Sequence, residues 1–372
     1  MRRLFHRGPE DAEAYCSRGF AHACKGDYDK AIADYNHAIR LRPDYAEAYI
    51  NRGAAHWLKG DYDRAIADFN EATRLRPDYA EAYLNRGVAY HDKGDYDKAV
   101  PDFTEALRLR PDFTEAYDNR GLAYGQKGDY DRAIADYTQA IRLRPDYAKA
   151  YLNRGNAYAD KKEHDKAMAD YNQAIRLRPD YADAYNSRGI AYGQKGDYDK
   201  AIADCNQAIR LRPDYAEAYN NRGIAYVGKG EHDRAIADCT QALRLRPDDA
   251  GAYHNRGLAY RHKGDYDRAI ADYNQAIRLR PDHPEAYINR GTAYYAKGDY
   301  DRAMADYTEA LRLRPDLAEA HASLGMALAK KKDTVAACRA LNQAWALRER
   351  LPDKGERIRK LMEELKCDEL GD

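Results

Sequence analysis

The feature that most constrains this chain is an internal repeat with a period of 34 residues. The proline of an Arg-Leu-Arg-Pro motif recurs with that spacing at positions 43, 77, 111, 145, 179, 213, 247, 281 and 315. A unit this short cannot bury its own apolar surface and must stack on copies of itself. The period therefore predicts an extended array of repeats rather than one globular core.

Ten units follow one another when Ala12 is taken as repeat position 1. Seven repeat positions are identical in all ten: Ala at 3, 10, 20 and 27, Gly at 8, Lys at 14 and Leu at 30. The predicted units are 12–45, 46–79, 80–113, 114–147, 148–181, 182–215, 216–249, 250–283, 284–317 and 318–351. Residues 1–11 are predicted to be the end of a preceding unit, because Pro9 is in register with Pro43. They are either the remnant of a truncated unit or an N-terminal contact surface. Residues 352–372 are predicted to form a capping helix and a tail.

Each unit is predicted to contain two helices, here named helix A and helix B. In the second unit, Asp44 and Glu47 have the spacing of a capping box, which starts a helix. Gly60 suits the left-handed turn that ends helix A, and Asp61 opens helix B. Apolar side chains of helix B then fall on one helical stripe: Tyr62, Ala65, Ile66, Phe69, Ala72 and Leu75.

The unit as a whole resembles the tetratricopeptide repeat (TPR). It shares that repeat's length, with an aromatic residue at position 4, Gly at 8, Tyr at 11, Ala at 20, an aromatic residue at 24, Ala at 27 and Pro at 32. The resemblance implies an all-α, right-handed superhelical solenoid of ten tandem helix-turn-helix repeats. It also implies a concave groove lined by helix A and no catalytic activity.

Composition and charge exclude several other classes. Lys plus Arg is 62 and Asp plus Glu is 62, whereas binding to nucleic-acid phosphates needs a surplus of cations. No apolar run approaches the roughly 18 residues of a membrane span, and the first residues lack the apolar stretch of a signal peptide. The six cysteines show no C-x-x-C pair, which is typical of free thiols in a reducing compartment. We therefore expect a cytoplasmic protein.

Catalytic residues, cofactors and metal ligands are not predicted. Five histidines stand where other units have a framework aromatic residue: His22, His56, His164, His232 and His321. Cys205 and Cys239 likewise replace an aromatic residue at position 24, so we expect small buried hydrophobic side chains there. No phosphate-binding or nucleophile motif is present, and an enzyme is not expected.

Variation among the ten copies predicts where a partner binds. Positions 5, 9, 12 and 13 of helix A carry seven, eight, seven and eight residue types. Position 25 of helix B is only Asn or Thr, and position 26 is only Gln, Glu or His. Because residues three and four apart share a helical face, the varied positions line one surface. We interpret this surface as diversified for recognition of a partner.

Position 6 of helix A is nearly constant and predicts how a peptide is held. It is Ser in three units and Asn in the other seven: Asn51, Asn85, Asn119, Asn153, Asn221, Asn255 and Asn289. Carboxamides can pair with the main chain of an extended peptide whatever its sequence. The row is similar to the asparagine ladder of the O-linked N-acetylglucosamine transferase repeat domain. The alternative is that each Asn bonds the neighbouring helix and specifies stacking.

Apolar residues of the same face are candidate side-chain anchors. They are Trp57, Tyr295, Leu84, Leu152 and Ile288. The apolar residues at position 9 are interpreted instead as packing between successive A helices.

The sequence therefore predicts a scaffold that binds an extended segment of a protein partner. The acidic residues at position 2 suggest a partner with basic residues. Only Lys149 and Asn156 match isolated positions of the carboxylate clamp used by chaperone adaptors of the TPR family, so that mode is not expected. The alternative function is a structural solenoid that forms dimers or filaments through its ends.

A departure from the family pattern predicts an ion pair inside each unit. Nine units have Arg at position 7 and Asp at position 23, and the tenth has Leu324 and Ala340 in their places. We predict that the guanidinium on helix A pairs with the carboxylate on helix B in a partly buried position.

Overall fold

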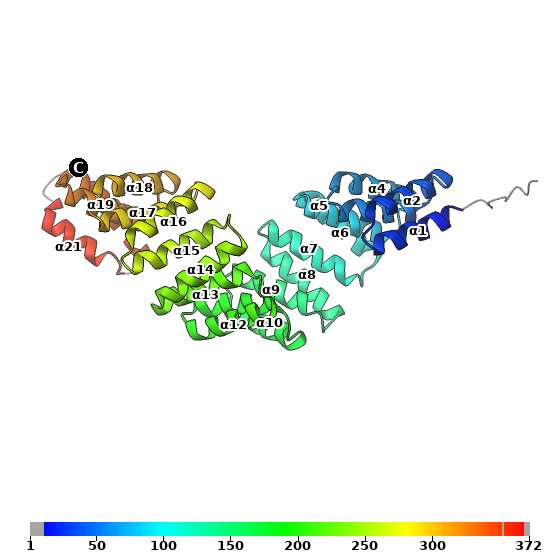
Figure 1. The fold of residues 1–372 in the computed structure, drawn as a ribbon, viewed down its shortest axis with the longest axis horizontal. Coiled ribbons are helices and arrows are strands. Elements are labelled where there is room, and N and C mark those ends of the chain that lie inside the picture. The colour runs from blue at the N-terminus through cyan, green and yellow to red at the C-terminus, as the bar shows by residue number, and fades with distance from the viewer. Residues whose placement is uncertain (1–10, 352, 368–372) are drawn as a thin grey trace, which may run out of the picture. The chain divides into compact units, whose positions relative to one another are not determined.

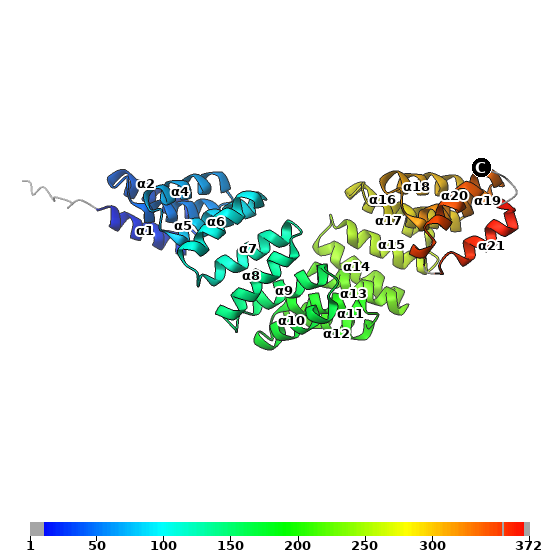
Figure 2. The same cartoon turned by 180° about the vertical axis from the view of Figure 1, so that it is seen from behind.

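The computed structural model describes residues 11–351 and 353–367. All secondary-structure elements within these residues are helices (Figure 1). The chain forms two compact units, Met1–Pro179 and Asp180–Asp372. Figure 2 shows the same helices from behind. The expected remnant before residue 11 lies outside the described residues, as do Pro352 and the last five residues of the expected tail.

The first compact unit holds five pairs of helices A and B. They are α1 (Ala12–Cys24), α2 (Tyr28–Leu41), α3 (Ala46–Leu58), α4 (Tyr62–Leu75), α5 (Ala80–Asp92), α6 (Tyr96–Leu109), α7 (Thr114–Gln126), α8 (Tyr130–Leu143), α9 (Ala148–Asp160) and α10 (His164–Leu177). Each helix A begins at repeat position 1, so the predicted all-α helix-turn-helix array is confirmed for these repeats.

The second compact unit holds five further pairs and a final helix. They are α11 (Ala182–Gln194), α12 (Tyr198–Leu211), α13 (Ala216–Lys229), α14 (His232–Leu245), α15 (Ala250–His262), α16 (Tyr266–Leu279), α17 (Pro284–Ala296), α18 (Tyr300–Leu313), α19 (Ala318–Lys330), α20 (Thr334–Ala346), the short 3-10 helix η1 (Arg348–Arg350) and α21 (Glu356–Leu365).

The two helices of a repeat start in different ways. Asp61 accepts a hydrogen bond from the backbone N–H of Arg64 at 3.2 Å, as predicted for the start of helix B. The predicted capping box at the start of helix A is wrong. Tyr45, not Asp44, occupies the N-cap of α3, and no side chain caps that helix end. The ring of Tyr45 lies instead beneath the guanidinium of Arg42, 4.5 Å from it.

The turn between helix A and helix B requires a left-handed residue. Gly60 has φ +79°, as predicted for the end of α3, and the same position is glycine in seven other repeats. Lys162 and Lys332 hold the turn in the remaining two repeats with φ 63°. A side chain with a Cβ is strained in this conformation by about 1 kcal/mol or more.

Lys162→Gly should therefore raise the stability of the first unit by about 1 kcal/mol, because glycine adopts φ near +60° without strain. The measurement is the urea midpoint of the variant against the wild type. Lys161→Gly is the matched control, because Lys161 has φ −77° and glycine gains nothing there. A stabilisation by both variants, or by neither, would contradict the strain argument.

The core of each repeat forms where glycine at position 8 faces the residue at position 24. A Cβ placed on Gly53 would lie 2.7 Å from the ring of Phe69, which is 1 % exposed. Helix A thus approaches helix B closely enough that only glycine fits. Cys205 and Cys239 are buried at position 24, as predicted, and burial raises the pKa of each thiol to about 12.

The predicted C-terminal helix is present as α21 and covers the last repeat. Ile358 is buried against Leu341 and Ala344 of α20. The expectation that all six cysteines are free is wrong, because Cys338 of α20 forms a disulfide with Cys367, which follows α21. Cys16, Cys24, Cys205 and Cys239 are free.

Candidate peptide-binding face

The predicted ion pair between positions 7 and 23 is confirmed in all nine repeats that have both residues. In the fourth repeat, Nε and Nη2 of Arg120 donate to the two carboxylate oxygens of Asp136, each at 2.8 Å. The other pairs are Arg18–Asp34, Arg52–Asp68, Arg86–Asp102, Arg154–Asp170, Arg188–Asp204, Arg222–Asp238, Arg256–Asp272 and Arg290–Asp306. Each pair fixes the rotation of helix A against helix B, since both oxygens are engaged.

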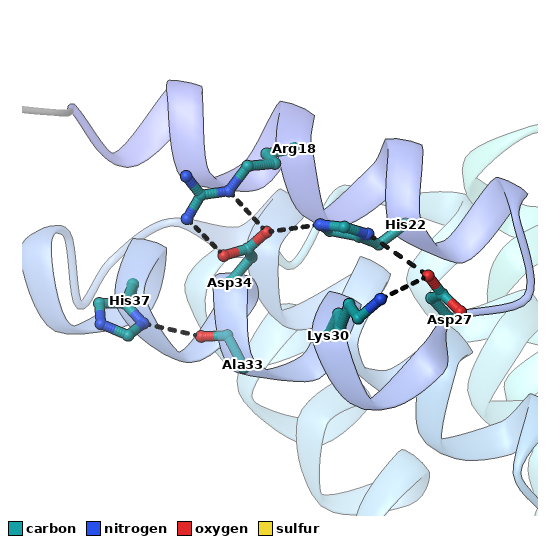
Figure 3. A network of polar contacts seen from close by, with 7 residues as sticks. All are labelled: Arg18, His22, Asp27, Lys30, Ala33, Asp34 and His37. Carbon is teal, nitrogen blue, oxygen red and sulfur yellow. Dashed lines mark hydrogen bonds and ion pairs between the residues drawn. The ribbon is translucent and has the colours of Figure 1, made fainter.

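Figure 3 shows this pair in the first repeat, where it belongs to a larger network. Arg18 of α1 and Asp34 of α2 face each other, and the hydrogen bond from Arg18 lowers the pKa of Asp34. His22 lies 3.8 Å from Asp34, and Lys30 donates to Asp27 at 3.0 Å. Every side chain that the network joins comes from α1, α2 or the turn between them, so its geometry supports the framework of this repeat.

The same arginines also explain why position 25 varies so little. Nη1 of Arg120 donates to Thr104 of the preceding repeat at 3.1 Å, and Nη1 of Arg290 donates to Asn274 at 2.7 Å. Equivalent bonds join Arg52 to Asn36, Arg86 to Asn70, Arg154 to Thr138, Arg222 to Asn206 and Arg256 to Thr240. Position 25 must therefore keep an oxygen acceptor.

Position 26 is constrained in a similar way within helix B. Arg108 donates to Glu105 at 2.6 Å and Arg142 donates to Gln139 at 2.8 Å, in each case from position 29. The contrast in variation between helix A and positions 25 and 26 does not by itself indicate a recognition surface, because both positions of helix B hold contacts. The variation of helix A must be interpreted from its own surroundings.

Five of the seven asparagines of position 6 contact the preceding helix A through the amide nitrogen. Asn153 donates to Asp118 at 2.9 Å, Asn221 to Asn186 at 2.9 Å, and Asn255 to Asn220 at 3.0 Å. In the same way Nδ2 of Asn51 lies 3.5 Å from Cys16 Sγ, and that of Asn289 lies 3.2 Å from His254 Nε2. Asn119 donates to the backbone oxygen of Glu115 at 2.8 Å, and Asn85 is half-buried. These contacts support the stacking role that the sequence left open for this row.

Position 5, the acceptor of those bonds, lies between successive A helices. Asp118 is 1 % exposed and also accepts from Lys149 at 2.9 Å and from the hydroxyl of Tyr147 at 3.3 Å. The variety at position 5 therefore reflects packing between repeats. It is not evidence of a recognition surface.

Positions 9 and 13 do reach the surface. Position 13 is exposed in all ten repeats, and position 12 is half-buried in all ten. The exposed large apolar residues on these positions are Phe20, Leu58, Ile190, Ile224 and Met326. Assigning position 9 to packing alone is thus wrong for Ile190 and Ile224. We name the side chains of positions 9, 12 and 13 the helix A face.

The predicted anchor residues fall into two groups. Leu152 and Ile288 are buried and Leu84 packs into the core, so these three side chains are not offered to a partner. Trp57 and Tyr295 are half-buried on the helix A face. The indole N–H of Trp57 donates to Asp92 of the next repeat at 2.7 Å, and the ring of Tyr295 packs edge-on against Tyr300 at 5.2 Å.

Seven of the eight acidic residues of position 2 are paired within their own repeats. Glu13 accepts from Arg42 at 2.9 Å, and Asp183 accepts from Arg212 at 2.9 Å. The same pairing joins Glu47 to Arg76, Glu81 to Arg110, Glu115 to Arg144, Glu217 to Arg246 and Glu285 to Arg314. These arginines largely neutralise the acidic residues of position 2, which in the sequence are a reason to expect a partner with basic residues.

A hollow of about 620 Å³ opens on the helix A face between α7 and α9. Its walls include Gly125 of α7, Tyr130 and Tyr137 of α8, and Asn153 and Asp160 of α9. Burial raises the pKa of Asp160, and no opposing charge lowers it. Sequence reasoning missed Gly125 and Asp160 as site residues, because each is unremarkable until the two repeats are stacked.

His254 marks an acid-sensitive point in the second unit. Burial lowers the pKa of His254 from 6.5 to about 4, and its Nδ1 has no hydrogen-bond partner among the described residues. The ring packs 5.1 Å from that of His283, and Glu285 and Arg280 also lie near it. The folded state therefore binds fewer protons than the unfolded state when the pH falls below 6.5.

Stability from the neutral His254 is thus complete above pH 6.5 and is lost progressively toward pH 4. We expect a loss of about 2 kcal/mol between pH 7 and pH 5. His254→Asn should remove most of this loss, since Asn186 and Asn220 accept the same amide bond elsewhere. Urea unfolding at the two pH values measures it, with the exposed His37→Asn as control. An unchanged pH dependence in His254→Asn would contradict the assignment.

Sequence comparisons identify the family. A family model described as TPR repeat matches residues 23–60, 58–94, 124–162, 155–196, 257–298 and 291–332, more than half of the chain. The chain belongs to the tetratricopeptide repeat family. Two further models described as tetratricopeptide repeat match residues 80–113, 182–215 and 216–249, and residues 239–271. The first three of these segments coincide with predicted repeats.

Several solved structures share this fold at low sequence identity. A tetratricopeptide repeat protein from Parabacteroides merdae has 23 % identity and a TM-score of 0.55, covering 67 % of this chain and 98 % of its own. The Cut9–Hcn1 hetero-tetramer of APC/C gives 15 % identity and a TM-score of 0.60, with 95 % and 90 % covered. Yeast Tom70 gives 18 % and 0.50, with 96 % of each chain covered. No curated protein sequence matches significantly.

None of the helices in residues 11–351 and 353–367 has the length and apolar character needed to cross a membrane. Within the same residues, no three His, Cys, Asp or Glu side chains gather closely enough to hold a metal ion.

Proposed function

We propose that this TPR protein is a non-catalytic scaffold that binds an extended segment of a protein partner on the helix A face. The carrying observation is the recurrence of exposed apolar side chains at position 9, in four repeats, with Leu58 beside them at position 13. Phe20 is 58 % exposed, Leu58 50 % and Ile224 46 %. Exposed large apolar side chains that recur on one helical face offer apolar area that a partner can bury.

The asparagines of position 6 can contribute to peptide binding only with the part of each amide that is not engaged in stacking. Asn153 and Asn221 each use one amide N–H to hold the preceding helix, so the amide oxygen and the second N–H remain for a peptide main chain. A peptide N–H could donate to these oxygens while the stacking contacts stay in place. Basic residues in the partner are no longer expected along the whole face, because most carboxylates of position 2 are paired.

The test compares two sets of exposed apolar residues. Ile190→Ser with Ile224→Ser removes apolar contact from the helix A face, whereas Leu245→Ser with Leu279→Ser changes helix B at similar exposure. Proteins that co-purify with the wild type are quantified for each variant by mass spectrometry. The proposal expects a partner that is lost with the first variant and kept with the second. Equal recovery with both variants would contradict it.

Self-assembly through the ends is the competing function. Helix α21 packs its apolar side on the last repeat, with Ile358 buried there, which leaves less apolar surface for stacking at that end. Light scattering between low and high concentration separates the two functions. Growth in mass with concentration would favour the structural solenoid.

We also propose that the protein is located in the cytoplasm. The disulfide between Cys338 and Cys367 is the observation that argues against it, since disulfides are rare in reducing compartments.

A further inference from the structure

Position 12 of one repeat and position 13 of the next repeat form a direct contact in one part of the chain and leave a hollow in another. Position 12 of the second repeat is Trp57, whose indole N–H donates at 2.7 Å to Asp92 at position 13 of the third. Position 12 of the fourth repeat is Gly125, and position 13 of the fifth is Asp160. The two residues of each pair are 35 positions apart. Asp160 therefore has the same relation to Gly125 that Asp92 has to Trp57, but Gly125 has no side chain to contact it. The structure has a hollow there instead.

Asp160 is the acidic group of this hollow and is exposed to solvent. It makes no hydrogen bond or ion pair with any of the described residues, whereas Asp92 also contacts His91 at 3.1 Å. The lysines nearest to the hollow are already engaged. Lys127 in its wall pairs with Asp97, and Lys161 pairs with Asp131 and Glu163. The carboxylate of Asp160 therefore lacks a counter-ion among the residues that the structure describes.

The other walls of the hollow suit a flat cation. Tyr130 and Tyr137 contribute aromatic rings, and Asn153 contributes an amide whose nitrogen is already bound to Asp118. In the second unit the corresponding tyrosine, Tyr198, fills the space itself, and a Cβ on Gly228 would lie 2.4 Å from its ring. Asp160 has the same repeat position as Gly228, and Tyr130 has the same position as Tyr198. In the first unit, however, the tyrosine lines an open hollow.

We propose that this hollow binds an arginine side chain of the peptide that the helix A face takes up. The guanidinium lies beside Asp160 as the Trp57 indole lies beside Asp92. It supplies an N–H donor, as the indole does, and also a positive charge that pairs with the carboxylate of Asp160. Its planar group can donate to Asp160 and to the oxygen of Asn153 while it lies against a tyrosine ring. The proposal rests on the proposed function and specifies one residue of the bound segment.

Two nine-residue peptide pools test the assignment by fluorescence anisotropy with the full chain. One pool has a fixed central arginine and the other has citrulline, which is neutral and of nearly the same shape. The wild type should bind the arginine pool about tenfold more tightly, from one exposed ion pair and one cation–π contact. Asp160→Asn should reduce this ratio to near one. Gly125→Trp should do the same by filling the hollow, and no atom outside its own helix lies within 4 Å of a Cβ at Gly125.

Asp92→Asn is the matched control, because it changes the same repeat position where Trp57 already occupies the site. It should leave the preference for arginine unchanged. Equal binding of both pools by the wild type would overturn the arginine site and still support peptide binding on this face. Binding of neither pool would overturn the arginine site and the proposed function together.

Discussion

Arg120→Leu is expected to lower the free energy of unfolding of the first unit by about 3 to 5 kcal/mol. Arg120 is 18 % exposed at its side chain and Asp136 is 8 % exposed, so the variant leaves a carboxylate buried without its partner. The variant also removes the bond from Arg120 to Thr104 of the preceding repeat. Urea unfolding followed by circular dichroism measures the loss.

A second substitution separates the pair from the packing of the arginine stem. Adding Asp136→Ala removes the stranded carboxylate and reproduces the combination of Leu324 and Ala340 that the last repeat uses. The double variant should therefore recover much of the stability that Arg120→Leu loses. Losses that simply add in the double variant would contradict a coupled pair.

Arg18→Leu provides a matched control within the same unit. Arg18 pairs with Asp34 in the same geometry, but its side chain is 51 % exposed. Solvent screens this pair, so the expected loss is about 1 kcal/mol or less. Equal losses at Arg18 and Arg120 would show that burial does not set the strength of the pair.

The sequence was sufficient for the period and for most features within one repeat, although the capping box predicted at Asp44 is wrong. The helix-turn-helix unit and the Arg120–Asp136 pair both follow from residues less than 34 positions apart. The pair could be predicted because Leu324 and Ala340 replace both partners in one repeat. Gly60 in the left-handed turn was predicted on the same local grounds.

Contacts between repeats were harder to predict. Arg120 holds Thr104 of the preceding repeat, and Asn153 holds Asp118 of the preceding helix A. Low variation at position 25 and high variation at position 5 both arise from such contacts. A single sequence shows only how residue types vary, and it does not separate a constrained contact from an exposed surface. The hollow has the same cause, since Gly125 and Asp160 meet only when two repeats stack.

The disulfide was missed for a related reason. Cys338 and Cys367 are separated by 29 residues without a recognisable motif, and they meet only because α21 folds back on α20. Counting cysteines along the chain gives no information about that approach.

Removing the disulfide is expected to have the second largest effect on stability. Cross-linking a loop of this length stabilises a folded segment by about 3 to 4 kcal/mol through the entropy of the unfolded chain. Helix α21 has 10 residues, and helices this short are marginal without tertiary support. Its anchoring therefore depends on Ile358 in the apolar contact with α20 and on the cross-link together.

Hydrogen exchange measures this effect at the helix itself. In Cys338→Ser, or after reduction of the wild type, amide protection in α21 should fall by about a hundredfold. The apolar surface that α21 covers, which includes Leu341 and Ala322, would then open to solvent more often. Cys24→Ser is the control, because Cys24 is exposed and free, and it should leave α21 unchanged. If α21 stays equally protected after reduction, packing of Ile358 alone anchors the helix and the disulfide contributes little.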